Sequence, residues 1–203
     1  VGNPLLGNLS GIENLTRIGG AFWILERNES LVSLDGLENL SHIGSDFLIG
    51  VSFVHSLSRE RGFPLANIEA LGNLDSIGGM FNICGTQLKE FSGLESLTNI
   101  DGPLEIYSND ALTSISALSS LSSIGGSLVI SHNDSIESLN GLDNINPNSI
   151  KKLRINTNKS LSTCEVQSIC ASLAIADSNT SIHENAEGCN SQQEIEDACA
   201  GVG

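Results

Sequence analysis

Apolar and polar positions recur along this chain in units of similar length. The segments TRIGGAFWI (16–24), SHIGSDFLI (41–49), DSIGGMFNI (75–83), TNIDGPLEI (98–106) and SSIGGSLVI (122–130) are copies of one pattern. Spacings of 25, 34, 23, 24 and 24 residues separate the apolar residues that lead the units, which are Leu9, Leu34, Ile68, Phe91, Ile115 and Leu139. The spacing of 34 is one unit plus an insertion of about ten residues, and self-similarity of this kind is typical of repeat architectures.

Each unit contains a stretch L-x-I that alternates with a period of two, as a strand with one buried face does. The expected buried pairs are Phe22/Ile24, Phe47/Ile49, Phe81/Ile83, Leu104/Ile106, Leu128/Ile130 and Leu153/Ile155. The glycines that precede the strands are expected to allow a positive φ at a corner. They are Gly19, Gly20, Gly78, Gly79, Gly125 and Gly126. Asn109, Asn133 and Asn158 follow the strands, where their amides can bond to the backbone of a turn or to the next unit.

This unit, written L-x-x-L-x-x-I-G-G-x-L-x-I-x-x-N, resembles a leucine-rich repeat of the receptor L-domain type, found in ectodomains of the insulin and epidermal growth factor receptors. It is also similar to secreted bacterial leucine-rich-repeat proteins whose arrays close with a cysteine-containing cap. The resemblance covers about residues 3–163, although the N-terminal cysteines of the receptor domains are missing. It implies a right-handed coil, an extracellular setting and a binding role.

One unit cannot bury its apolar face alone, so we expect the units to stack with their strands about 4.8 Å apart. The predicted fold is a mostly β solenoid, a right-handed leucine-rich-repeat coil like the receptor L domain. It has one parallel sheet of about six strands, by the count of L-x-I stretches, and a small disulfide-linked cap containing α-helix. We assign 1–163 to the solenoid, with an insertion at 51–67, and 164–203 to the cap.

Both ends of the chain are informative. Asn3–Leu6 aligns with Asn133–Ile136, so the chain starts inside a unit, and an uncovered first unit is expected to be a surface for self-association. In the cap, the apolar spacing after Cys164 predicts one helix. The capping-box pattern of Ser191–Glu194 predicts a second helix through about Ala200, and Thr180–Glu184 is expected to form a short edge strand.

Four of the five cysteines lie in the last forty residues, with 5, 18 and 9 residues between them. These spacings fit no zinc ribbon or finger, whose ligands come in close pairs. We predict two disulfides and therefore an oxidising compartment. Three pairings are possible, of which we favour Cys164–Cys189 with Cys170–Cys199. Cys84 is left as the thiol outside the disulfides.

The formal charge of −15 excludes several classes of partner. Residues 160–203 contain seven acidic residues and no Lys or Arg, and the remainder carries seventeen acidic and nine basic residues. Such a chain lacks the basic footprint of a nucleic-acid-binding protein and would be repelled by anionic lipid. It also has no run of about 18 apolar residues, so we expect no membrane insertion.

Outward-facing strand positions are the best candidates for a binding surface. The middle residue of L-x-I gives one row, which is Trp23, Leu48, Asn82, Glu105, Val129 and Arg154. The residue after the isoleucine gives a second row, which is Leu25, Gly50, Cys84, Tyr107, Ser131 and Asn156. An exposed face with scattered aromatic residues is typical of recognition surfaces, although sheets also favour aromatic residues for packing between rungs. From these rows we select Trp23, Leu48, Glu105, Tyr107, Val129 and Arg154 as binding residues.

The insertion provides further candidates, because solenoid insertions emerge as loops on one face. Phe53, Arg59 and Arg61 are added to the binding residues on this basis. The alternative is a loop that packs on itself and has no partner.

The sequence contains few features that indicate an enzyme. The four histidines are scattered, and Cys84 and His132 lie two rungs apart, about 10 Å, too far for a nucleophile and its base. No phosphate-binding or calcium-loop motif accompanies the glycines. We therefore expect no catalysis, cofactor or metal. Seven N-x-S/T sequons are glycan acceptors only in a eukaryotic secreted protein: Asn8, Asn14, Asn28, Asn39, Asn133, Asn158 and Asn179.

The hypothesis is a secreted or cell-surface binding or adhesion module that recognises a protein or glycan through its sheet face and the 51–67 loop. The alternative is a structural spacer within a larger surface protein, with no ligand of its own. A carbohydrate-active enzyme is a third and more remote reading.

Overall fold

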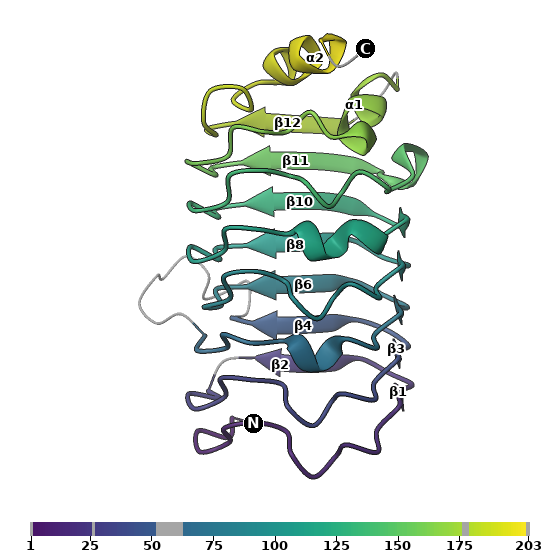
Figure 1. Cartoon of the computed structure of the whole chain (residues 1–203), viewed down its shortest axis with the longest axis vertical. Helices are drawn as coiled ribbons and strands as arrows, with labels where there is room; N and C mark the ends of the chain where they lie inside the picture. The colour runs from purple at the N-terminus through teal and green to yellow at the C-terminus, as the bar shows by residue number, and fades with distance from the viewer. Residues whose placement is uncertain (1, 26, 52–62, 176–178, 202–203) are drawn as a thin grey trace.

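In the computed structural model, the repeat units stack along one axis, with the N-terminus at one end and two helices at the other (Figure 1). The structure describes residues 2–25, 27–51, 63–175 and 179–201. The first five units each contribute one short strand and one longer strand, the last two contribute a longer strand without a described short strand, and the chain returns between units along a third side. The Leu and Ile side chains of all three sides point inward and fill a continuous core.

The larger sheet has seven parallel strands. They are β2 (Phe22–Leu25), β4 (Phe47–Gly50), β6 (Phe81–Cys84), β8 (Leu104–Tyr107), β10 (Ser127–Ser131), β11 (Lys152–Asn156) and β12 (Asn179–His183). Neighbouring strands pair in the register of the repeat, so each inward residue lies beside its equivalent in the next unit. The predicted L-x-I pairs are buried, and only Phe22 in the first unit keeps partial exposure.

A second parallel sheet has five strands of two residues each. They are β1 (Arg17–Ile18), β3 (His42–Ile43), β5 (Ser76–Ile77), β7 (Asn99–Ile100) and β9 (Ser123–Ile124). Their isoleucines point into the core, and the corner residues that follow lead into the seven-stranded sheet. The return side contains two short 3-10 helices, Glu69–Leu71 and Ser116–Ser120, and a third, Pro147–Ser149, lies beside β9.

The predicted fold class was wrong. In the part of the chain that the structure describes, two parallel sheets of seven and five strands occur with two α-helices, which makes an α/β fold. A mostly β solenoid with one sheet of about six strands does not describe it. The five-stranded sheet was missed because strands of two residues are too short to show an alternating pattern. The seventh strand of the larger sheet, β12, comes from the segment assigned to the cap.

The role expected for the corner glycines was also wrong. None of the six has a positive φ. At four of them, Gly78, Gly79, Gly125 and Gly126, glycine is instead needed because the backbone of the preceding unit lies against it. A Cβ atom at Gly44 would lie 2.5 Å from the carbonyl oxygen of Gly19, and one at Gly125 would lie 1.9 Å from that of Asp101. Real Cβ atoms do not make such contacts, so a side chain at these glycines would force neighbouring units apart.

Buried asparagines connect the units where the longer strands end. The side chains of Asn109, Asn133 and Asn158 are fully buried, and each Oδ1 accepts hydrogen bonds from the unit before it. Each Nδ2 donates to a carbonyl in the strand of the preceding unit, such as that of Ile106 for Asn133. The ladder continues to Asn185 in the last unit. The amides therefore bond both to backbone and to the next unit, as predicted.

The C-terminal end is closed by two helices, α1 (Gln167–Leu173) and α2 (Gln192–Ala200). Ser191 caps α2, because its Oγ accepts a hydrogen bond from the backbone N–H of Glu194. The structure contains the disulfides Cys164–Cys189 and Cys170–Cys199, which is the pairing that we favoured from the sequence. The Cys164–Cys189 disulfide is buried in the core. The Cys170–Cys199 disulfide connects α1 to α2.

Candidate binding surface

The outward side of the seven-stranded sheet is more varied than the sequence predicted. Trp23 on β2 is 60% exposed, and Leu48 lies beside it on β4 and is half-buried. Asn82 and Val129 also point outward but are only 4% exposed. Val129 lies between the longer side chains of Glu105 and Arg154 on the neighbouring strands, which cover it. Of the outward row, only Trp23 is exposed, and the other five residues are partly or fully buried.

A polar cluster occupies the middle of this face. Asn82 Nδ2 donates a hydrogen bond of 3.2 Å to Glu105 Oε2. Burial raises the pKa of Glu105 above its usual value, although the bond from Asn82 and the charge of Arg154 act in the opposite direction. Burial also raises the pKa of Tyr107 to about 12, with a further contribution from the negative charge of Glu105. A hydrogen bond from Arg154 to Tyr107 lowers that pKa, so Glu105, Tyr107 and Arg154 form one electrostatic group.

The single tyrosine of the chain makes this cluster measurable. We expect phenolate absorbance to titrate near pH 12 in the folded protein and near the ordinary value of 10.0 after unfolding. Because the folded pKa is the higher one, the contribution of Tyr107 to stability is complete below about pH 10 and is lost as the pH rises toward 12. Glu105→Gln is expected to lower the pKa of Tyr107, whereas Glu137→Gln, on an exposed site of the return side, leaves it unchanged. Titration of folded Tyr107 at its ordinary value would contradict the described cluster.

The second outward row is mostly internal. Cys84 is 4% exposed and is not part of a disulfide, and Ser131 is 2% exposed. Ser131 Oγ donates a hydrogen bond to Asn156 Oδ1 and lies 2.7 Å from His132 Nδ1. The Ser131 side chain at the end of β10 is therefore engaged in hydrogen bonds and does not form an open site.

A thiol titration tests this arrangement. With two disulfides and a buried Cys84, we expect slow reaction with a thiol reagent in the folded protein and one equivalent per chain in denaturant. A Cys84→Ser variant provides the control and should give none. Five equivalents in denaturant, without reductant, would contradict both disulfides.

The insertion is described at both of its ends, at Val51 and at residues 63–67. Phe53, Arg59 and Arg61 lie outside the described residues, and their predicted binding role stays a prediction. Phe63, directly after them, is 3% exposed and forms a bridge with Thr86. The insertion therefore rejoins the array beside the ends of β4 and β6.

Exposed apolar side chains gather in the first two units, from which the sequence analysis selected Trp23 and where it expected an uncovered surface. Among the described residues, the large apolar side chains with high exposure are Leu5 (93%), Trp23 (60%), Val32 (52%), Ile12 (42%) and Ile175 (38%). Four of the five belong to the first two units.

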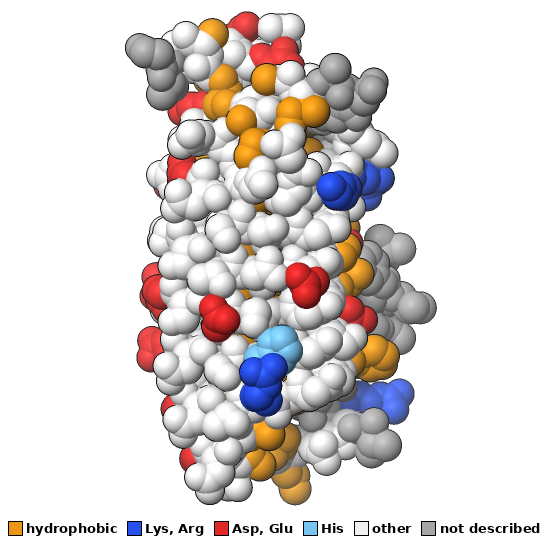
Figure 2. Space-filling view, turned by 90° about the vertical axis from the view of Figure 1, so that its right-hand side faces the viewer, with side chains coloured by type: hydrophobic (Ala, Val, Ile, Leu, Met, Phe, Trp, Pro, Cys, Tyr) orange, Lys and Arg blue, Asp and Glu red, His pale blue; other side chains and the backbone are white. Residues whose placement is uncertain are grey.

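The side of the molecule over the five-stranded sheet is polar and carries few charges (Figure 2). Its outward strand positions hold Arg17, His42, Ser76, Asn99 and Ser123 in one register. His42 Nδ1 lies 2.9 Å from Ser76 Oγ, so neighbouring units also hydrogen-bond across this sheet.

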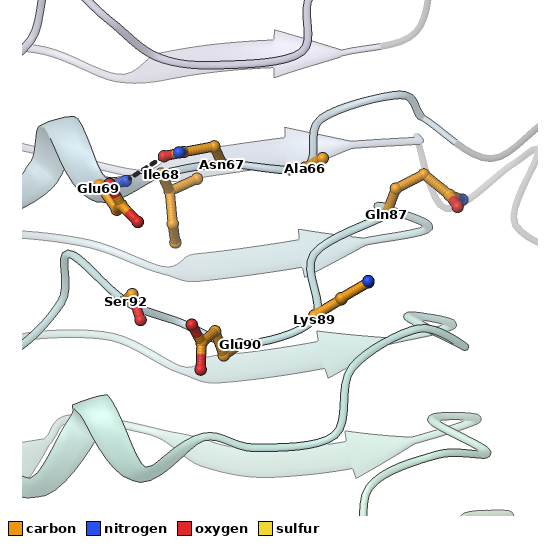
Figure 3. Close-up of a pocket in the computed structure, with 8 residues that line it drawn as sticks. All are labelled: Ala66, Asn67, Ile68, Glu69, Gln87, Lys89, Glu90 and Ser92. Atoms are coloured by element: carbon orange, nitrogen blue, oxygen red, sulfur yellow. Dashed lines mark hydrogen bonds between the residues drawn. The ribbon is translucent and has the colours of Figure 1, made fainter.

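A pocket of about 340 Å³ lies on the return side (Figure 3). Its lining comes from two neighbouring units and consists of Ala66, Asn67, Ile68, Glu69, Gln87, Lys89, Glu90 and Ser92. Asn67 Oδ1 accepts a 2.7 Å hydrogen bond from the backbone N–H of Glu69, and Lys89 points away from the two carboxylates. The Ser92 hydroxyl in the lining is not hydrogen-bonded to either carboxylate. The absence of enzymatic activity stays a prediction.

Two further observations limit the chemistry of the surface. Within the described ranges, no three His, Cys, Asp or Glu side chains are grouped so that they could hold a metal ion. Among the sequons, Asn133 and Asn158 are fully buried in the asparagine ladder, so the folded protein cannot present them for glycosylation.

Comparisons with protein-family models, curated proteins and solved structures gave no match. None of the described helices is long and apolar enough to span a membrane.

Proposed function

We propose that this chain is an extracellular or cell-surface binding module of the leucine-rich-repeat type. Its recognition surface is the patch formed by Trp23 and Leu48 on the outward side of β2 and β4, and its partner is a protein or glycan. The observation that supports this proposal is the 60% exposure of Trp23, in a chain with a single tryptophan, beside a second apolar side chain. Exposing tryptophan to water is unfavourable, and tryptophan is enriched among residues that dominate binding energy.

The surroundings of the patch are consistent with this role. Glu105, Tyr107 and Arg154 lie further along the same face and offer charged and hydroxyl groups at its rim. An apolar centre with a polar rim is the usual anatomy of a binding surface. The two disulfides are compatible with an oxidising, extracellular location.

A binding screen against glycans and extracellular proteins tests the proposal. The wild type is compared with Trp23→Ala/Leu48→Asp and with Val32→Asp as a matched control. Val32 is similarly exposed but lies outside both sheets. We expect the double variant to weaken binding by about 30-fold or more, the loss typical of a hot-spot residue, and Val32→Asp to bind like the wild type.

When circular dichroism confirms that each variant is folded, the results distinguish a binding module from a structural spacer. Binding that survives in the double variant would remove the Trp23–Leu48 patch as the recognition surface. The absence of any ligand for the wild type would favour the alternative, a structural spacer within a larger surface protein.

A further inference from the structure

The strands of the seven-stranded sheet carry almost none of the negative charge of the chain. Their residues include one acidic side chain, Glu105, and two basic side chains, Lys152 and Arg154. With His183 neutral, two positive charges and one negative charge give these strands a net charge of +1, whereas the whole chain has a formal charge of −15. Apart from Glu105, the acidic residues therefore lie outside the strands of this sheet.

Both basic side chains point outward from β11. Leu153 and Ile155, which alternate with them along the strand, are buried in the core. The two basic residues therefore share the outward side, with their Cα atoms about 6.6 Å apart. Arg154 donates a hydrogen bond to Tyr107 on β8. The ion pairs between described residues do not include Lys152, so its ammonium group is available to an anion.

The two strands beside β11 surround these cations with small polar side chains. Lys152 lies between Ser127 on β10 and Asn179 on β12. We call the outward residues of the three strands the basic face, and they are Ser127, Val129, Ser131, Lys152, Arg154, Asn156, Asn179, Ser181 and His183. None of them is acidic, and the one aliphatic side chain, Val129, is only 4% exposed.

Two acidic residues border the basic face, and both are bonded to neighbours. On β8, Glu105 accepts a hydrogen bond from Asn82. After β12, Glu184 accepts a hydrogen bond of 3.0 Å from Thr157 Oγ1 and lies 3.9 Å from His183 Nδ1. Acidic residues on the other sides of the coil act weakly here, because the screening length is about 8 Å at physiological salt. An anion on the basic face therefore meets two cations and the hydroxyl and amide groups around them.

We propose that the basic face binds an acidic saccharide, a short glycan chain that carries carboxylate or sulfate groups. Lys152 and Arg154 pair with the anionic groups, and the guanidinium of Arg154 can hold two oxygens at once. The hydroxyl and amide side chains around them match the hydroxyl groups of a sugar, because each can both donate and accept hydrogen bonds. The ligand is short, since a long polyanion would extend over the acidic remainder of the surface.

A protein partner fits the basic face less well. Protein interfaces depend on aromatic and apolar anchors at their centre. The outward residues of β10, β11 and β12 include no exposed apolar side chain. The chemistry of the face therefore favours a ligand that is bound through charge and hydroxyl groups.

The basic face is separate from the Trp23–Leu48 patch. That patch lies on β2 and β4, and five strand spacings of about 4.8 Å separate β2 from β11. The inference therefore goes beyond the proposed function and does not depend on it.

Isothermal titration calorimetry on the full chain tests the proposal. Four probes of similar length are used: an oligogalacturonate, a heparin oligosaccharide, a neutral maltooligosaccharide and an oligoglutamate peptide. Lys152→Gln/Arg154→Gln is compared with Lys89→Gln/Lys159→Gln, which removes two positive charges elsewhere. Lys89 lies in the return-side pocket, and Lys159 pairs with Asp134. Lys152→Gln alone is the mildest variant, because the Lys152 side chain makes no hydrogen bond or ion pair with another described residue.

We expect the wild type to bind one or both acidic saccharides and not the neutral one. Lys152→Gln/Arg154→Gln should weaken this binding about tenfold or more, and Lys152→Gln alone about threefold, since each change removes a charge-assisted contact. Lys89→Gln/Lys159→Gln and Trp23→Ala/Leu48→Asp should bind like the wild type. Higher salt should weaken the binding, because it screens the charges.

Several results would overturn the proposal. One is the failure of both acidic saccharides to bind, and another is equal binding of the neutral saccharide. Equal losses in the Lys152→Gln/Arg154→Gln and Lys89→Gln/Lys159→Gln variants would mean that the ligand responds only to overall charge. Tighter binding of the oligoglutamate peptide would assign the face to an acidic protein segment. Binding lost only in Trp23→Ala/Leu48→Asp would place the saccharide on the Trp23–Leu48 patch, which would support the proposed function and overturn this inference.

Discussion

Replacing Asn133 with alanine is expected to reduce the free energy of unfolding by about 3 kcal/mol or more, which makes it one of the most damaging single changes in the chain. Its Oδ1 accepts hydrogen bonds of 3.0 and 3.3 Å from the backbone and side chain of Asn109. Its Nδ2 donates to the carbonyls of Ile106 and Ser131 and to Asn158 Oδ1. Alanine would leave these buried groups without their partners in an apolar interior, where each costs about 1–3 kcal/mol.

Asn144→Ala is the matched control for this prediction. Asn144 also donates to a carbonyl of the preceding unit, that of Ser119, but it is exposed, and water can replace the bond. We expect its effect to stay below about 1 kcal/mol. Urea denaturation of both variants measures the difference. Equal losses would mean that the ladder contributes no more than a surface hydrogen bond.

The sequence predicted those features that repeat in every unit over enough residues to be visible. The L-x-I pairs, the asparagines after them and the two cap helices all recur or follow local rules, and the structure has them where expected. The five-stranded sheet was missed because its strands, such as Ser76–Ile77, are only two residues long. The reason for the corner glycines was missed because the backbone that lies against them belongs to the preceding unit. The residues next to such a glycine in the sequence do not reveal this contact.

For the candidate surface too, the sequence could predict one part and not another. Alternation correctly placed Trp23 and Val129 on the outward side of the sheet, but outward does not mean exposed. The exposure of a small residue depends on the length of the side chains beside it on neighbouring strands, and Glu105 and Arg154 flank Val129. The register between units must be known before such neighbours can be assigned, and one sequence gives it only approximately.

Phe47→Ala is expected to cost about 3–5 kcal/mol, because the side chain is fully buried and its loss leaves a cavity between two aromatic rings. The Phe47 ring stacks on Phe22 at a centroid distance of 5.4 Å and on Phe81 at 5.2 Å. Backbone movement cannot close this cavity without breaking the register of β2, β4 and β6, so little of the loss can be recovered by relaxation.

Phe22→Ala is the matched comparison, because the same residue type occupies the same position one unit earlier. Among the described residues, Phe22 stacks on Phe47 alone, and it is partly exposed. Its removal should therefore cost clearly less, about half as much, since part of the ring is already in water. Chemical denaturation of both variants at several protein concentrations gives the two values. If Phe22→Ala costs as much as Phe47→Ala, and the cost grows with protein concentration, then Phe22 is covered in solution by another molecule. The difference between these two phenylalanines thus measures directly how much of the Phe22 ring is exposed to water.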